Sequence, residues 1–176
     1  MEKRKPIAYI AGFECFYEDG AERAQRAVDL CQKYGVEAIS PVLGQDGKVV
    51  DFSKGKREAA RQIYEYNMGY LDACDMIIAN LNTFRGNEPD SGTCVECGIA
   101  IAKGKKCFAF VEDARPMVQS FKGKTVTDKN GVLRDLEGAN IEDFDMPLNL
   151  MIGIPFTIVQ GDIEQALIEV KKQFNL

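Results

Sequence analysis

The chain has 176 residues, of which 45% are hydrophobic, and this size and composition suit one domain with a sizeable core. A net charge of -5 and a sequence pI near 4.9 argue against a nucleic-acid polymer or an anionic membrane surface as partner. The apolar run that follows the basic N-terminus is too short for a signal peptide or a membrane span, so we expect a cytoplasmic protein that acts on small molecules.

Short apolar runs alternate with longer segments of helical periodicity along the chain. Strands are expected at 7–11, 36–39, 76–79, 107–111 and 156–159, and helices at 18–34, 54–74, 91–103 and 162–174. Successive strand-helix units favour a parallel sheet with right-handed crossovers. The predicted fold is an α/β three-layer sandwich with a five-stranded parallel sheet, of the flavodoxin-like or Rossmann-like type.

The segment 114–146 does not follow this alternation. It contains Asn130-Gly131 between two short alternating runs, which is a hairpin signal. It has too few apolar residues for a core of its own. We therefore expect a single domain over residues 1–176, with a hairpin-like excursion around 114–146.

The chain has six cysteines and no histidine. Only Cys94 and Cys97 have a spacing known from redox pairs and zinc sites, but a structural zinc needs four ligands and no second pair is present, so we interpret them as buried thiols. The lack of histidine excludes Ser-His-Asp and Cys-His nucleophile systems and histidine-based metal sites. Acid-base chemistry near neutral pH therefore falls mainly to carboxylates.

Two carboxylates follow the third predicted strand. Asp90 lies on a polar loop, and Glu96 lies in the first turns of a helix that Ser91 or Thr93 can cap. The helix dipole favours an ionised Glu96, which suits a nucleophile, and repulsion between the two charges favours Asp90 as its acid partner. The ordinary alternative is a turn residue and a charge on the helix flank. We predict that the pair carries the chemistry of the protein.

Three further positions have a structural and a functional interpretation. The aromatic cluster at 13–17, which includes Phe16, is either part of the core or a stacking wall for a planar ligand. Asn67 is either a solvated helix flank or a hydrogen-bonding group aimed at a ligand. Gly92, at a helix start, can belong to a cradle for an anion, which would also suit a non-catalytic nucleotide-binding module.

The block F-R-G-N-E-P-D-S-G-T-C-V-E-C-G resembles a motif of the nucleoside 2-deoxyribosyltransferase family. The segments Tyr9-Ile10-Ala11-Gly12 and Asn149-Leu150-Met151 extend the resemblance over most of the chain, except the excursion around Asn130. The resemblance implies that Glu96 attacks the anomeric carbon of a 2'-deoxynucleoside. It also implies that Asp90 contacts the sugar and handles the proton of the leaving base, and that the hydroxyl of Tyr9 holds the nucleophile.

The same resemblance implies the substrate-binding residues. Phe16 would stack on the base, and a neighbouring subunit would donate Asn149 for the sugar 5'-hydroxyl and Met151 beside the glutamate. Asn67 stands where the best-known members carry an aspartate, so base preference stays open. The implied partners are 2'-deoxynucleosides, free nucleobases and further copies of the chain, as a dimer or a hexamer.

The implied reaction is a double displacement without a cofactor or metal, in which a glycosyl-enzyme ester on Glu96 passes 2-deoxyribose between nucleobases. One alternative is an N-glycosidase that hydrolyses 2'-deoxynucleosides or their 5'-monophosphates. Members that act on monophosphates resemble this chain but carry a serine in place of Asp90, whose charge would repel a phosphate. The other alternative is the non-catalytic nucleotide-binding module.

Overall fold

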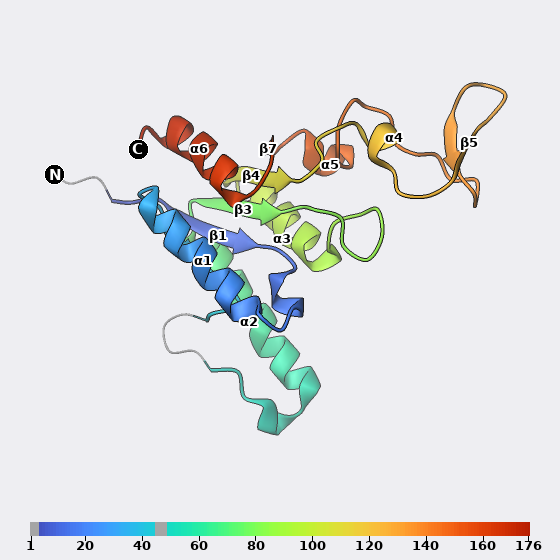
Figure 1. The fold of residues 1–176 in the computed structure, drawn as a ribbon. Helices are drawn as coiled ribbons and strands as arrows, with labels where there is room; N and C mark the ends of the chain where they lie inside the picture. Colours follow the sequence, from blue (N-terminus) through green and yellow to red (C-terminus); the bar gives the residue numbers. More distant parts are fainter. Residues whose placement is uncertain (1–3, 45–48) are drawn as a thin grey trace.

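A computed structural model describes residues 4–44 and 49–176. Its central feature is a five-stranded parallel sheet in the order β2-β1-β3-β4-β7 (Figure 1). The strands are β1 (Ile7–Ala11), β2 (Glu37–Ile39), β3 (Met76–Asn80), β4 (Lys106–Val111) and β7 (Thr157–Gln160). The predicted fold is confirmed, and the strand order is that of flavodoxin-like proteins.

Long helices cover both faces of the sheet (Figure 1). They are α1 (Gly20–Lys33), α2 (Lys56–Ala73), α3 (Ser91–Ala102) and α6 (Ile163–Phe174). One apolar cluster joins α2 and α3 to alternate residues of the inner strands, including Ile77 and Ala79, and the other joins α1 and α6 to the intervening residues, including Ile78 and Phe108. Every residue of β3 is buried, because both of its faces are covered.

The caps of two helices fix where the polar loops end. The last helix starts with the predicted cap, because Asp162 forms a capping box with Gln165. The start of α3 differs from the prediction, since Asp90 is the cap and Ser91 is already helical. The carboxylate of Asp90 accepts a hydrogen bond from the backbone N–H of Thr93. Asp90 is therefore the N-cap, in place of the hydroxyl of Ser91 or Thr93 that was expected.

The segment between β4 and β7 leaves the sheet. It contains α4 (Met117–Ser120), an antiparallel pair of β5 (Thr125–Thr127) and β6 (Leu133–Asp135), and α5 (Leu150–Gly153). Asp128 Oδ1 accepts hydrogen bonds from the backbone N–H groups of Asn130 and Val132, which shapes the turn. Figure 1 shows β5 well away from the sheet, and no residue of β5 or β6 is buried. Leu148, nearer the end of the segment, belongs to the apolar cluster that includes residues of α2 and α3.

Two short 3-10 turns lie between the larger elements. They are η1 (Glu14–Phe16), directly after β1, and η2 (Phe52–Lys54), before α2. The predicted surface loop after Pro41 is described except for residues 45–48, which lie outside the described residues. No helix in the described part of the chain combines the length and apolar character that a membrane crossing needs.

Candidate active site

Three elements bring their side chains together around Glu96. The Tyr9 hydroxyl on β1 donates a hydrogen bond of 2.6 Å to Glu96 Oε1 on α3. The Asn67 amide on α2 donates to the same oxygen over 3.4 Å. Residues that are 29 and 87 positions apart in sequence therefore meet at one carboxylate oxygen. The other oxygen, Oε2, has no hydrogen-bond partner among the described residues.

Burial controls the electrostatics of this carboxylate. It is the main cause that raises the pKa of Glu96 to about 7, and the charge of Asp90 acts in the same direction. The hydrogen bonds from Tyr9 and Asn67 lower this pKa and offset part of the rise. Burial therefore outweighs the helix dipole, which was expected to favour the ionised form of Glu96. Glu96 lies in the second turn of α3, where the dipole has largely faded, and burial has the greater effect.

The phenol of Tyr9 is held as a hydrogen-bond donor. Its side chain is completely buried, and burial together with the neighbouring Glu96 raises the pKa of Tyr9 far above its usual value. A neutral phenol can donate its only proton to the carboxylate. Tyr9 therefore fixes the position of Glu96 Oε1.

Asp90 combines a structural contact with a position in the site. Its Oδ2 accepts hydrogen bonds from the Thr93 backbone N–H at 2.9 Å and from Thr93 Oγ1 at 3.0 Å. A Cβ at Gly92 would lie 3.1 Å from this oxygen, so glycine leaves it uncrowded. Asp90 Oδ1 has no hydrogen-bond partner in the described part of the chain and is available to a ligand.

A cleft of about 860 Å³ opens where β1 and β3 end. Glu96, Asp90, Asn67 and Gly92 all line it. In the observed strand order this is the point where the chain connections diverge, which is where open α/β sheets bind their ligands. The volume lies within the range of cavities that hold a small organic molecule.

Aromatic residues next to the cleft separate into core and surface. Phe13 is buried, whereas Phe16 is 55% exposed and lines the cleft. Both rings stack on Phe84, with centroids 4.8 and 5.3 Å apart, and the Arg85 guanidinium lies 4.6 Å from the Phe84 centroid. Arg85 adopts a φ of 55°, an uncommon conformation for a residue with a side chain. The cluster supports Phe16 as a wall of the cleft.

Residues 8–151 match the family model described as nucleoside 2-deoxyribosyltransferase. The chain belongs to the nucleoside 2-deoxyribosyltransferase family. A solved structure described as 2-desoxiribosyltransferase from Leishmania mexicana is similar, with 31% identity, coverage of 97% of this chain and 99% of that chain, and a TM-score of 0.74.

Two solved structures of lower sequence identity share the fold of this chain. A 2-deoxyribosyltransferase from Bacillus psychrosaccharolyticus has 17% identity, a TM-score of 0.56, and coverage of 90% of this chain and 88% of that chain. A conserved protein from Enterococcus faecalis V583 has 19% identity, a TM-score of 0.59, and coverage of 97% and 99%. An uncharacterized protein of Schizosaccharomyces pombe is 33% identical over 111 residues, 62% of this chain, which spans about half (52%) of that protein's length.

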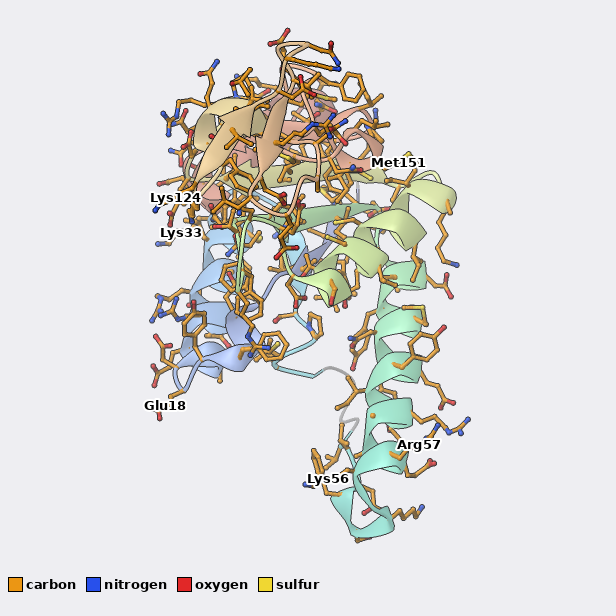
Figure 2. The ribbon with its side chains drawn as sticks, turned by 90° about the vertical axis from the view of Figure 1, so that its right-hand side faces the viewer. Glu18, Lys33, Lys56, Arg57, Lys124 and Met151 are labelled. Atoms are coloured by element: carbon orange, nitrogen blue, oxygen red, sulfur yellow. The ribbon has the colours of Figure 1, made fainter. Side chains whose placement is uncertain are left out.

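Asn149 and Met151 do not line the Glu96 cleft of their own chain. Asn149 caps α5 and donates a hydrogen bond from Nδ2 to Glu142 over 2.8 Å. Met151 is 71% exposed, and Figure 2 shows it at the periphery of the molecule. Both line a separate pocket of about 430 Å³ beside α3. That they complete the active site of a neighbouring subunit stays a prediction.

The structure also adds polar groups to the cleft that the sequence patterns did not single out. Glu14 on η1 and Asn80 at the end of β3 line it, joined by a hydrogen bond of 2.6 Å. Asn80 offered a signal, because it is a polar residue that directly follows a run of apolar ones. Glu14 offered none, because only the turn after β1 directs it toward β3.

Proposed function

We propose that this protein is a nucleoside 2-deoxyribosyltransferase that moves 2-deoxyribose between nucleobases through a covalent ester on Glu96. The observation that carries the proposal is a half-buried glutamate in the cleft whose Oε1 is held by Tyr9 and Asn67. Such a carboxylate is positioned by two donors while its second oxygen is left for reaction. No cofactor is required for this chemistry.

In the first half-reaction, Glu96 Oε2 is the nucleophile. It forms a bond to the anomeric carbon of the bound deoxynucleoside, and the bond from that carbon to the base nitrogen breaks. The electron pair of the broken bond goes to the base. The donors on Oε1 keep the carboxylate oriented toward the sugar during this step, and because the pKa of Glu96 is about 7, a substantial fraction is ionised at neutral pH.

Asp90 balances the protons of the two half-reactions. A proton on Oδ1 passes to the departing base, which leaves neutral, while Oδ2 keeps its hydrogen bonds to Thr93. In the second half-reaction an incoming base attacks the same carbon and breaks the ester, and its proton returns to Asp90. Two displacements on one carbon retain its configuration.

Asn67 acts on the nucleophile in this proposal. Its amide donates to Glu96, whereas an aspartate at the same place would bring a second negative charge close to Oε1. An amide also has no acidic proton to give to a base. Protonation of the leaving base therefore falls to Asp90 alone.

The substrates follow from the same site and from the surface beside it. We assign 2'-deoxynucleosides and free nucleobases as substrates, with the base on Phe16. We also assign a homo-oligomer in which Asn149 and Met151 complete the site of a neighbouring subunit. The exposed apolar side chains around α5, including Met151 and the 75% exposed Ile154, support such an interface.

The test is incubation of the protein with 2'-deoxyinosine and free adenine, followed by chromatography. Deoxyadenosine is the product expected of transfer, and hypoxanthine without deoxyadenosine would instead indicate hydrolysis. A parallel reaction with the 5'-monophosphate of deoxyinosine tests the glycosidase that prefers phosphorylated substrates. If no deoxynucleoside and base pair gives a product while nucleosides still bind, the protein is a binding module.

A covalent intermediate adds a second criterion. Mass spectrometry of the protein after a slow deoxynucleoside analogue should show one deoxyribosyl group on the peptide that contains Glu96. Glu96→Gln should show none, because an amide oxygen is a poor nucleophile. Turnover by the wild type with an adduct on another residue would refute the assigned nucleophile.

A further inference from the structure

Glu14 is a further carboxylate in the cleft, besides Glu96 and Asp90, and one of its oxygens already accepts a hydrogen bond. Glu14 Oε1 accepts a hydrogen bond of 2.6 Å from Asn80 Nδ2. Glu14 Oε2 has no hydrogen-bond partner among the described residues, and the residue lines the same cleft as Glu96. The site therefore offers one carboxylate oxygen to a ligand from this position.

The orientation of Asn80 is determined by its other contacts. The backbone N–H of Asn82 can only donate, and it points at Asn80 Oδ1 over 3.2 Å. The side chain of Asn82 donates to the same atom over 2.8 Å and accepts from the backbone N–H of Glu112 at the end of β4. Asn80 must therefore present its NH₂ group to Glu14, which requires an acceptor on Glu14 at that place.

Gly12 creates the space in which the second oxygen lies. A Cβ at this position would come within 2.1 Å of Glu14 Oε2 and within 3.0 Å of the Asn80 Cβ. The carboxylate thus folds back against the backbone that follows β1. It is held between the ends of β1 and β3, at the place where the ligand cleft opens.

The same 3-10 turn carries the aromatic wall. Glu14 begins η1 and Phe16 ends it, and both line the cleft, so a base stacked on Phe16 lies beside the turn that carries this carboxylate. A carboxylate oxygen accepts hydrogen bonds from amino groups and repels carbonyl oxygens. Base edges differ in this respect, because adenine and cytosine carry an exocyclic amino group where hypoxanthine and uracil carry a carbonyl.

We propose that Glu14 is a specificity-determining residue, whose Oε2 accepts a hydrogen bond from the exocyclic amino group of a nucleobase. This inference rests on the transfer reaction proposed above and adds the class of base to it: amino bases are preferred over their oxo counterparts. Asn80 and Gly12 are positioning residues, since they fix the carboxylate and do not touch the base.

Glu14→Gln tests the proposal, because it replaces a hydrogen-bond acceptor by a donor at the position of Oε2. The amide oxygen of the new side chain keeps the bond from Asn80, so its NH₂ group takes the place of Oε2 and donates. The variant should favour oxo bases. We expect the ratio of kcat/KM for 2'-deoxyadenosine over 2'-deoxyinosine to fall by about tenfold or more, since a site that pairs with one edge leaves the other unpaired.

The two substrates have the same sugar, so the ratio of their kcat/KM values distinguishes a contact with the base from a contact with a sugar hydroxyl. A contact of Glu14 with a sugar hydroxyl would change both kcat/KM values by the same factor, and a change in their ratio below about threefold refutes the inference. Glu14→Ala provides a second variant, which should lose the preference without reversing it. If that variant keeps the wild-type ratio, Glu14 does not read the base.

Binding of free adenine and free hypoxanthine, measured by calorimetry, keeps this test separate from the proposed reaction. The wild type should bind adenine more tightly, and Glu14→Gln should bind hypoxanthine more tightly. If the wild type binds both bases but turns over no deoxynucleoside, the proposed function fails while the inference about Glu14 is still decided by the binding ratio. Equal affinities in both proteins refute it.

Discussion

Glu96→Gln separates the cost of burying this carboxyl group from its role in turnover. In the folded protein the pKa of Glu96 is raised from its ordinary 4.5 to about 7, chiefly by burial. The folded state therefore binds the proton more tightly than the unfolded state. The resulting contribution to stability is complete below pH 4.5 and is lost as the pH rises through about 7.

The magnitude follows from the size of the pKa change. A difference of one pKa unit corresponds to about 1.4 kcal/mol, so the wild type should lose about 3 kcal/mol of unfolding free energy at this site between acidic pH and pH 8. Glutamine has no proton to lose but keeps an acceptor for the Tyr9 hydroxyl. The unfolding free energy of Glu96→Gln minus that of the wild type should therefore increase by about 3 kcal/mol between pH 4.5 and pH 8.

Urea unfolding at a series of pH values measures this difference. The matched control is Glu65→Gln, which removes an exposed glutamate of α2 outside the cleft and should leave the wild-type pH dependence unchanged. The same preparations should show loss of deoxyribosyl transfer in Glu96→Gln only. If wild type and Glu96→Gln lose stability in parallel from pH 4.5 to 8, burial does not perturb this carboxyl group and the reasoning is wrong.

Other changes test the remaining parts of the site. Tyr9→Phe removes a hydrogen bond that lowers the pKa of Glu96, so the loss of unfolding free energy with rising pH should extend to higher pH in this variant than in the wild type. An unmoved stability profile in the variant would contradict the role of the hydroxyl. Asp90→Asn should keep the helix cap but lose turnover. Asp90→Ala should lose turnover and also about 1 kcal/mol of unfolding free energy, because the cap is removed. Comparable activity in Asp90→Asn and wild type would exclude proton transfer by Asp90. Asn149→Ala should lower kcat/KM through the neighbouring subunit, and mixing it with inactive Glu96→Gln should restore part of the activity by forming hybrid sites; no recovery in subunits shown to exchange would refute the shared site.

The fold was predictable because its signals are local and repeated. Buried strands such as Met76–Asn80 are short apolar runs, and crossover helices such as Ile163–Phe174 combine a cap with helical periodicity. The start of α3 was less predictable, because Asp90, Ser91 and Thr93 are all good caps and the choice among them depends on the loop that leads into the helix.

Within the candidate site, the sequence and the resemblance selected Glu96, Asp90 and Tyr9, but their environment came from the structure. Helix position suggested an ionised Glu96, whereas burial raises its pKa to about 7. The sequence left Asn67 with two interpretations, and the structure directs its amide at Glu96. Glu14 was not selected at all, because its contact with a residue 66 positions away exists only in the folded chain.

The sequence by itself determined the alternation of strands and helices, the absence of histidine chemistry and the identity of the candidate nucleophile. These properties depend on residue type and on spacing over a few positions. Tertiary structure decided which oxygen of Glu96 is held, how far burial shifts its pKa, and which side chains share its cleft. Those properties depend on distances between segments far apart in the chain, and the parallel sheet sets these distances by bringing the ends of β1 and β3 together.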